Sequence, residues 1–347
     1  MDLETYSKNI TDFITGSYIT SAIRLGKDLG LFDELKRLDK AVSSQQLADA
    51  CNLKERYVRE WLGCLVSARI VSLDESDNYY IPQKLKPGLN AVSLTFFFPF
   101  MGTLTEKVKN CFRKDGPKGL SFGEMPSDLV EAIDEITTDP ESVVEQLLLP
   151  ITKPIRSITA ILDLGSGRGW VTRALSRRFP YKHIYGVDFN EDAITKAKAM
   201  SKSQGIKNVT FVKEDATSLP ADWTGKFDWV VLFELLHGLP DPVNAMKEVH
   251  RVLKDDGVVS IVDPDLHSNV RENVGDPNIA GIEYALSPLM CLPASLSVEN
   301  STGHGCGWGT ENKEAFLTSS GWRVKDKSNI DGPFALNFTC VKGSFET

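Results

Sequence analysis

The residues with the clearest chemical signature lie in a glycine-rich turn that follows an apolar stretch. The turn reads Asp163-Leu164-Gly165-Ser166-Gly167-Arg168-Gly169-Trp170. Glycines are needed where the backbone turns tightly and a ligand approaches so closely that a Cβ would collide with it. A dinucleotide site of the G-x-G-x-x-G type requires a third glycine at position 170, where this chain has Trp170. The D-x-G-x-G-x-G spacing therefore favours a ligand without a pyrophosphate.

Two acidic residues follow the next two apolar stretches. Asp188 closes Gly186-Val187-Asp188-Phe189, and a carboxylate there can accept hydrogen bonds from both hydroxyls of a ribose. Asp215, followed by Ala216, stands where an adenine amino group could be bonded. Phe189 either covers the adenine face or is a core aromatic. Phe233, at the end of the fourth apolar stretch, is assigned to the same crevice.

A histidine follows that fourth stretch, in Glu234-Leu235-Leu236-His237-Gly238. Ligands in open α/β sheets bind at the carboxyl ends of the strands, so we expect His237 to face the crevice. Histidine titrates near working pH, and a base of this kind contributes about 10² to 10⁴ in rate when a hydroxyl must lose its proton. The alternative is that His237 only shapes the loop. The residues alone leave both roles open.

A second glycine-rich run, Gly303 to Gly309, lies in a long insertion expected over residues 266–309. His304, Cys306 and Trp308 in this run are candidate contacts for a substrate, because such an insertion could close over it. His304 and Cys306 alone, without further ligands, make a poor zinc site, so no metal is expected. Asp263 and Asp265 lack an accompanying Asp-Asn pair, which favours structural or substrate-shaping roles over magnesium binding.

The elements that must hold these residues alternate regularly between strand and helix from residue 151 to the end of the chain. Apolar stretches predict strands at 158–164, 183–188, 209–212, 227–233 and 257–262, and helical periodicity predicts helices at 171–179, 193–203 and 242–253. This alternation predicts an α/β domain of the Rossmann-like type, a parallel sheet with helices on both faces.

The first 85 residues have a different pattern. Helical spacing over 10–38, a short helix capped by Ser43 or Ser44, and a helix over 54–67 precede β-like stretches at 70–73 and 79–81, which together predict a winged helix-turn-helix domain over 1–85. Up to Leu85 there are 11 Lys or Arg against 13 Asp or Glu. A reader of DNA presents a basic face on its recognition helix, so dimerisation or substrate covering is favoured over DNA binding.

Residues 86–150 are interpreted as a helical connector or lid with proline and glycine punctuation. Its aromatic residues (Phe96, Phe97, Phe98 and Phe100) either line a substrate pocket or pack between the two domains.

Composition narrows the class of protein. The chain of 347 residues has a formal net charge of -8, which argues against a duplex-binding surface. Its six cysteines are scattered without a C-x-x-C pair, a pattern typical of reduced thiols in the cytoplasm. The first residues show no basic segment followed by an apolar segment, which is the pattern of a signal peptide. The most apolar run, Leu94 to Leu104, is too short to span a bilayer. We therefore expect a cytoplasmic protein with no membrane or nucleic-acid partner.

The loops at residues 163–170, 186–189 and 213–216 resemble motifs I, II and III of class I S-adenosylmethionine (SAM)-dependent methyltransferases. The wider chain resembles the subgroup with an N-terminal winged-helix domain, in Glu55-Arg56-Tyr57-Val58-Arg59-Glu60-Trp61-Leu62 and in the runs 291–297 and 305–309. The resemblance implies SAM as cofactor, with Gly165, Gly167 and Gly169 at its methionine end, Asp188 on the ribose, and Asp215 and Ala216 near adenine. It also implies a possible homodimer through the N-terminal domain.

The position of His237 resembles that of the general-base histidine in plant small-molecule O-methyltransferases. In that family Asp and then Trp follow the histidine, whereas Gly238 follows it here. The predicted function is therefore methyl transfer from SAM to a small-molecule acceptor, with hydroxyl or thiol favoured and S-adenosylhomocysteine released. The alternatives are a SAM-sensing winged-helix regulator without turnover, an inactive relative used as a partner subunit, and an NAD-dependent oxidoreductase, which Trp170 disfavours.

Overall fold

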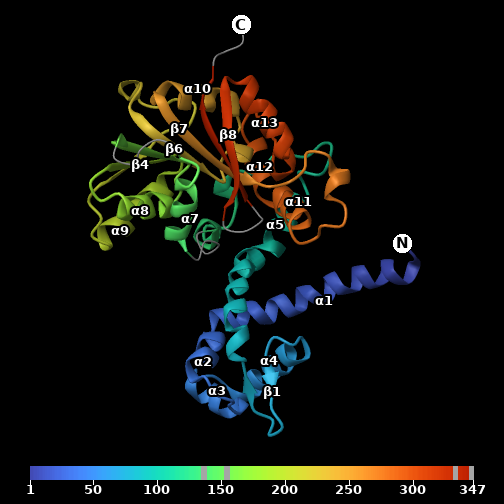
Figure 1. The fold of residues 1–347 in the computed structure, drawn as a ribbon. Coiled ribbons are helices and arrows are strands. Elements are labelled where there is room, and N and C mark those ends of the chain that lie inside the picture. Colours follow the sequence, from blue (N-terminus) through green and yellow to red (C-terminus); the bar gives the residue numbers. More distant parts are fainter. Residues whose placement is uncertain (134–138, 152–156, 331–334, 344–347) are drawn as a thin grey trace. The chain divides into compact units, whose positions relative to one another are not determined.

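The computed structural model describes residues 1–133, 139–151, 157–330 and 335–343. The chain divides into two compact units, Met1–Phe100 and Met101–Thr347 (Figure 1).

The N-terminal unit is a winged helix domain, as predicted. Its helices are α1 (Leu3–Asp28), α2 (Leu31–Leu38), α3 (Ser44–Ala50) and α4 (Glu55–Ser67), followed by the two-stranded hairpin of β1 (Ser72–Leu73) and β2 (Tyr79–Tyr80). Ser43 begins α3 with the predicted capping box, in which its hydroxyl accepts from Gln46 N. Buried leucines from three of these helices, namely Leu31, Leu35, Leu47, Leu62 and Leu65, form the core of the unit.

Helix α4, the recognition-helix position of a DNA-binding winged domain, has internally paired charges. Arg59 lies 2.9 Å from Glu55, and Arg56 pairs with Glu60, each pair being four residues apart on one helix face. These arginines therefore do not present the unpaired basic face that phosphate binding requires.

A continuous helical stretch, Gln83–Val108, is long and apolar enough to cross a membrane by length and composition alone. It consists of the 3₁₀ segment η1 (Gln83–Phe100) and helix α5 (Met101–Val108). Its buried side chains include Phe96, Phe97, Phe100, Leu104 and Val108, and 28% of the apolar window as a whole is buried. The expected connector 86–150 is thus divided, because its first part belongs to the N-terminal unit.

The rest of that connector belongs to the C-terminal unit. Beyond α5 it contains η2 (Phe122–Glu124), α6 (Leu129–Ile133) and α7 (Pro140–Leu148). Asp139 is the N-cap of α7, and its side chain accepts a hydrogen bond from Ser142 N. Pro140 occupies the first position of the helix.

The C-terminal unit is built on a seven-stranded sheet in the order β5-β4-β3-β6-β7-β9-β8. The five predicted strands are β3 (Ala160–Leu164), β4 (His183–Asp188), β5 (Val209–Lys213), β6 (Phe227–Phe233) and β7 (Leu253–Pro264), and each is parallel to its neighbours among the five. The sequence reading missed β8 (Trp322–Ile330) and β9 (Ala335–Lys342). Strand β9 pairs antiparallel with both β7 and β8, so the sheet is mostly but not wholly parallel.

The alternation of side chains along the strands produces a hydrophobic core on each face of the sheet. Leu162 and Leu164 of β3 join the cluster that includes α10 (Pro242–Val252) and α13 (Thr310–Ser319). Ile161 joins the other cluster, with α7 and α8 (Trp170–Arg178). Fully burying such a leucine or isoleucine contributes about 1.5–3 kcal/mol.

The strand order reverses between β3 and β6, and this reversal positions the site. Leu164 pairs with Val187 of β4 on one side and with Leu232 of β6 on the other, so the carboxyl ends of all three strands meet at one edge. A crevice opens at such a switch point because the following helices leave to opposite faces of the sheet. The insertion after β7 supplies η6 (Val270–Asn273), α11 (Ala280–Leu286), η7 (Ser287–Leu289), α12 (Cys291–Leu296) and η8 (Cys306–Trp308).

Candidate active site

The glycine turn after β3 has the backbone shape that its sequence predicts. Gly165, Gly167 and Gly169 have φ values of 77°, 52° and 78°, in the left-handed region. A Cβ at Gly165 would lie 2.7 Å from the side chain of Leu235, and one at Gly169 would lie 2.6 Å from Phe211. A Cβ at Gly167 would meet no atom within 4 Å. The outer glycines therefore permit close packing, while the middle glycine borders open space in which a ligand can lie.

Asp188 is held beside this turn by backbone donors. Its Oδ2 accepts from Gly167 N at 2.9 Å, and its Oδ1 accepts from Asn190 N at 2.8 Å. Burial raises the pKa of Asp188 above its ordinary value. Each carboxylate oxygen keeps a lone pair beyond these bonds, so both can accept from vicinal ribose hydroxyls.

Ser166 carries an unsatisfied polar atom in the same turn. Its Oγ is buried and has no hydrogen-bond partner among the described residues. Such a group costs about 1–3 kcal/mol unless something pairs with it, and a polar ligand in the turn would do so. The open space at Gly167 and the hydroxyl of Ser166 thus fit a nucleoside-type cofactor such as SAM.

Asp163 lies beneath the turn. It is 1% exposed, and its Oδ2 accepts from Thr172 Oγ1 of α8 at 2.6 Å. Burial raises the pKa of Asp163 to about 7. In this structure the carboxyl group ties β3 to α8, and it supports the glycine turn from inside the protein.

The predicted adenine-side residues lie around the ends of β4, β5 and β6. Phe189 is 59% exposed, and its ring lies 6.0 Å from that of Phe122 on η2. Asp215 is exposed and accepts from both the backbone N and the hydroxyl of Thr217, at 2.7 Å each, which leaves the half-buried Ala216 in a fixed turn. Phe233 packs edge-on against Trp170, with ring centroids 4.9 Å apart.

His237 belongs to a buried chain of charged groups. It lies in η5 (Leu236–Gly238) and is 3% exposed, and its Nδ1 is 2.9 Å from Asp263 Oδ1 at the end of β7. On the far side, Asp263 Oδ2 is 3.2 Å from the ammonium of Lys313 on α13.

The pKa shifts of these groups follow from the pairing. Burial alone would raise the pKa of Asp263, but Lys313 and then His237 hold it at about 2. Burial opposes the charge on His237 as well, yet Asp263 raises the pKa of His237 well above its usual range. The pairing with Asp263 therefore favours the protonated form of His237, whereas a base must be neutral.

Glu234 is a candidate residue that sequence reasoning missed. It follows β6 directly and has a φ of 51°, a left-handed conformation that is uncommon for a residue with a Cβ. Glu234 is solvent-exposed as a residue, while protein atoms crowd around its carboxyl group. This enclosure is the main reason that the pKa of Glu234 rises to about 8, and the carboxylates of Asp263 and Glu283 add to the rise. Left-handed backbone at a non-glycine position leaves no sequence signal.

The insertion brings its candidate residues to two different places. His304 stacks on Trp308 with ring centroids 3.7 Å apart and an interplanar angle of 2°, and burial lowers the pKa of His304. Cys306 is 2% exposed and lies next to His237 and Cys291. The sequence places Cys306 close to His304. In the fold, helix α12 instead brings Cys291 next to Cys306.

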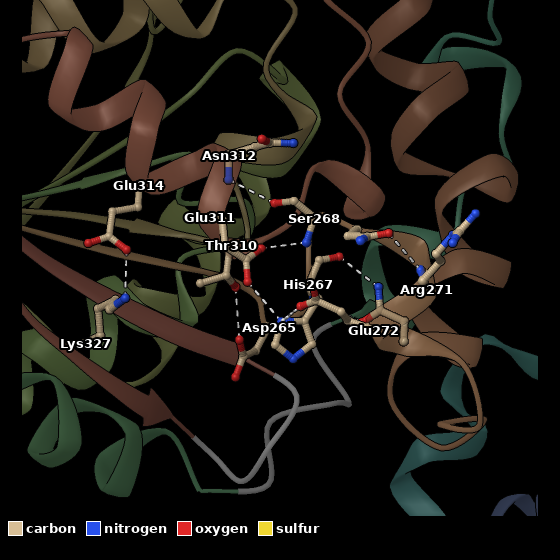
Figure 2. Close-up of polar contacts among 12 residues, drawn as sticks. Asp265, His267, Ser268, Arg271, Glu272, Thr310, Glu311, Asn312, Glu314 and Lys327 are labelled. Carbon is tan, nitrogen blue, oxygen red and sulfur yellow. Dashed lines mark hydrogen bonds and ion pairs between the residues drawn. The ribbon is translucent and has the colours of Figure 1, made fainter.

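A surface network anchors the N-terminus of α13 and so positions Lys313 (Figure 2). Glu311 accepts from Ser268 N at 2.6 Å and lies 2.9 Å from the imidazole of His267, while Thr310 donates to Asp265 at 3.0 Å. These bonds join the start of the helix to the segment that directly follows β7 and Asp263. Asp265 therefore has the structural role that the sequence favoured.

Comparison with known proteins identifies both units. Residues 155–291 match a family model described as a methyltransferase domain, and residues 17–90 match one described as an Rv2258c-like winged HTH domain. The demethylmenaquinone methyltransferases of Lactococcus lactis and Staphylococcus aureus (strain JH9) are each 37% identical to this chain, over 105 and 106 residues. These matches cover 30% of this chain, and 41% and 43% of those relatives.

Solved structures agree over nearly the whole chain at low identity. The mitomycin 7-O-methyltransferase has a TM-score of 0.68 at 16% identity, covering 98% of both chains. Human N-acetylserotonin methyltransferase, solved with SAM, has a TM-score of 0.67 at 16% identity, covering 99% of both. A methyltransferase of calicheamicin biosynthesis with bound S-adenosylhomocysteine has a TM-score of 0.67 at 17% identity, covering 99% of this chain and 100% of that one. At these identities the likeness establishes the fold.

Residues 155–291 therefore form a methyltransferase domain, on a fold shared with the solved methyltransferases. Residues 17–90 add a winged HTH domain.

Proposed function

We propose that this protein transfers a methyl group from SAM to a small molecule and releases S-adenosylhomocysteine. The proposal rests on the glycine turn after β3. This turn brings together open space at Gly167, an unsatisfied hydroxyl on Ser166 and a fixed carboxylate on Asp188. Bound SAM supplies a methyl group on a sulfonium, which a nucleophile attacks in line. The solved relatives whose titles mention SAM or S-adenosylhomocysteine support this choice of cofactor.

Each predicted cofactor residue then has a distinct task. The turn Gly165 to Gly169 receives the methionine end, Asp188 accepts from the ribose hydroxyls, and Phe189 covers the adenine, with Asp215, Ala216 and Phe233 around it. Asp163 supports the turn through Thr172. These assignments remain proposals, and SAM titration with single variants is their test.

The acceptor is proposed to be a hydroxyl or a thiol, with His237 as the group that removes its proton. Asp263 orients the imidazole through Nδ1, which leaves Nε2 for the acceptor, and Lys313 balances the charge of Asp263. The positive sulfonium disfavours a second positive charge nearby, so cofactor binding would push His237 toward the neutral form that a base requires. Proximity and the exclusion of water supply the remaining acceleration.

The experiment is a two-part assay on the full chain. Calorimetry with SAM and NAD in parallel should show binding of SAM alone, and binding of NAD without SAM would contradict the proposal. S-adenosylhomocysteine release should then be measured over a panel of phenols, thiols, amines and carboxylates. Turnover confined to amines or carboxylates would contradict the hydroxyl or thiol assignment.

We also propose that the protein forms a homodimer through α1. This helix exposes an apolar stripe at helical spacing, consisting of Leu3, Tyr6, Ile10, Phe13, Ile14 and Tyr18. A contiguous apolar helix face of this kind is typical of an association surface. Light scattering should give a dimer for the wild type and for the polar-face control Thr15→Glu, and a monomer for Ile10→Glu/Phe13→Glu. A monomeric wild type would refute the dimer. A cytoplasmic location stays a prediction.

A further inference from the structure

The cluster around His237 contains two thiols, of Cys291 and Cys306, that methyl transfer does not require. A ring nitrogen of His237 and the sulfur atoms of Cys291 and Cys306 all lie within 4.8 Å of one another. They come from three separate elements, η5, α12 and η8. One imidazole and two thiols are the donor set of the Cys₂His type of catalytic zinc site, which keeps a fourth position open.

The surroundings of these three residues hold them in place. The Nδ1 of His237 is engaged by Asp263 at 2.9 Å, so Nε2 is the ring nitrogen that remains for the thiols. Cys306 N donates to Ser287 Oγ at 3.0 Å, and Gly305 N donates to the carbonyl of His237 at 3.1 Å. A carboxylate on the second nitrogen of a metal-binding histidine is the usual arrangement around zinc, because it fixes the ring and raises its basicity.

The burial of the cluster also suits a soft cation. His237 is 3% exposed and Cys306 is 2% exposed, while Cys291 is half-buried and provides access. The carboxylate of Glu283 on α11 lies beside Cys306, and its pKa is raised chiefly by burial. Glu234, Asp263, Glu283 and Lys313 are thus the charged groups that face the cluster.

A second group of metal-ligating type, His267, Glu272 and Glu311, differs in each of these respects (Figure 2). All three residues are exposed and none is a thiol. The carboxylate of Glu311 is already used by Ser268 and His267 to anchor α13. This group therefore has a structural explanation that the thiol cluster lacks.

We propose that His237, Cys291 and Cys306 bind one Zn²⁺ or similar soft divalent cation, and that the ion competes with the catalytic proton for Nε2 of His237. Binding requires both thiols as thiolates and the imidazole in its neutral form, so the protons that these groups carry pass to the solvent and no group is oxidised or reduced. The competition rests on the proposed function, because it requires His237 to be the base. Metal binding itself does not depend on the proposed function.

The binding is tested with Co²⁺ as a spectroscopic probe on the full-length reduced protein without oxygen. We expect one equivalent to bind with a thiolate-to-cobalt absorption band. The band should weaken in Cys291→Ser and in Cys306→Ser, and disappear in the double variant. Cys64→Ser, a half-buried cysteine of the N-terminal unit, is the matched control and should bind as wild type does. Asp263→Asn should keep the band and weaken the affinity about 10- to 100-fold.

Retention of the band in the double variant would overturn the proposal, and so would a reduced wild-type protein that binds no Co²⁺. The competition is tested by adding Zn²⁺ to the methyl-transfer assay, which should inhibit the wild type and affect Cys291→Ser much less. Cobalt binding without turnover on any acceptor would leave the metal site standing and refute the proposed function. Turnover that zinc leaves unchanged would refute the competition alone.

Discussion

The two halves of the crevice are built in different ways. On the nucleoside half, the turn 165–169 and Asp188 come from two consecutive strands, and the contacts that shape the site are made by the backbone. On the acceptor half, His237, Asp263, Lys313, Cys291 and Cys306 come from five elements spread over more than seventy positions, and the contacts are made by side chains. A site shaped by backbone contacts tolerates substitutions at other positions. A buried network of charged side chains is disrupted when any one of them is replaced.

The difference explains how one fold can keep a cofactor and vary its acceptor. The nucleoside half requires only glycines and one acidic residue at fixed positions along the chain. The acceptor half depends on the insertion after β7, where η8 and α12 bring thiols to His237. Substitutions on the two halves should therefore separate cofactor affinity from turnover.

The largest effect is expected from His237→Ala. Loss of the base should lower kcat by about 10² to 10⁴ on the favoured acceptor, while SAM affinity stays that of the wild type. Steady-state kinetics together with calorimetry would measure both. Unchanged turnover with intact SAM affinity would remove His237 from the chemistry and leave it a role in shaping the loop.

Lys313→Met should be the most destabilising change on the acceptor half. The ammonium is fully buried and pairs with Asp263, and removing one partner of a buried pair costs about 3–5 kcal/mol because the other charge is left without compensation. Chemical denaturation would measure the loss. Lys327→Met, which removes an exposed pair with Glu314, is the matched control and should change the free energy of unfolding little. Equal effects of both variants would contradict the network.

Asp188→Asn should act on the nucleoside half alone. Weakening the charged acceptor for the ribose hydroxyls should reduce SAM affinity about 10- to 100-fold, the equivalent of about 1.5–3 kcal/mol for hydrogen bonds to a charged group. Asp222→Asn, at an exposed acid on η4, serves as control. Wild-type SAM affinity in the Asp188 variant would disprove the ribose assignment.

The smallest expected effect is a shift in pH dependence. A base must be neutral, and Asp263 raises the pKa of His237, so kcat/KM should rise with pH until the imidazolium is lost. Asp263→Asn removes the charge that raises this pKa, and the rising limb should move to lower pH. Glu234, whose pKa is raised to about 8, lies in the same site and also titrates, so wild type and Asp263→Asn should be compared in a Glu234→Gln background. A limb that moves to higher pH would contradict this electrostatic pairing.

Local sequence patterns were sufficient for the elements whose signal is strong. The five parallel strands were predictable because each contains a short apolar run, and the winged helix domain because its helices have a capped start and regular apolar spacing. Strand β8 was missed because its sequence, Trp322 to Ile330, is mostly polar and exposed, as an edge strand is. Strand β9 was missed with it, since its only neighbours are β7 and β8.

The sequence by itself determined the glycine turn and the place of Asp188 beside it, because those contacts are local and follow from backbone geometry. Only the tertiary structure decided that His237 is paired with Asp263 and Lys313, that Glu234 sits in a left-handed conformation, and that Cys291 joins Cys306. These are contacts between segments far apart in the chain. Their chemistry depends on distance and burial, which no residue spacing encodes.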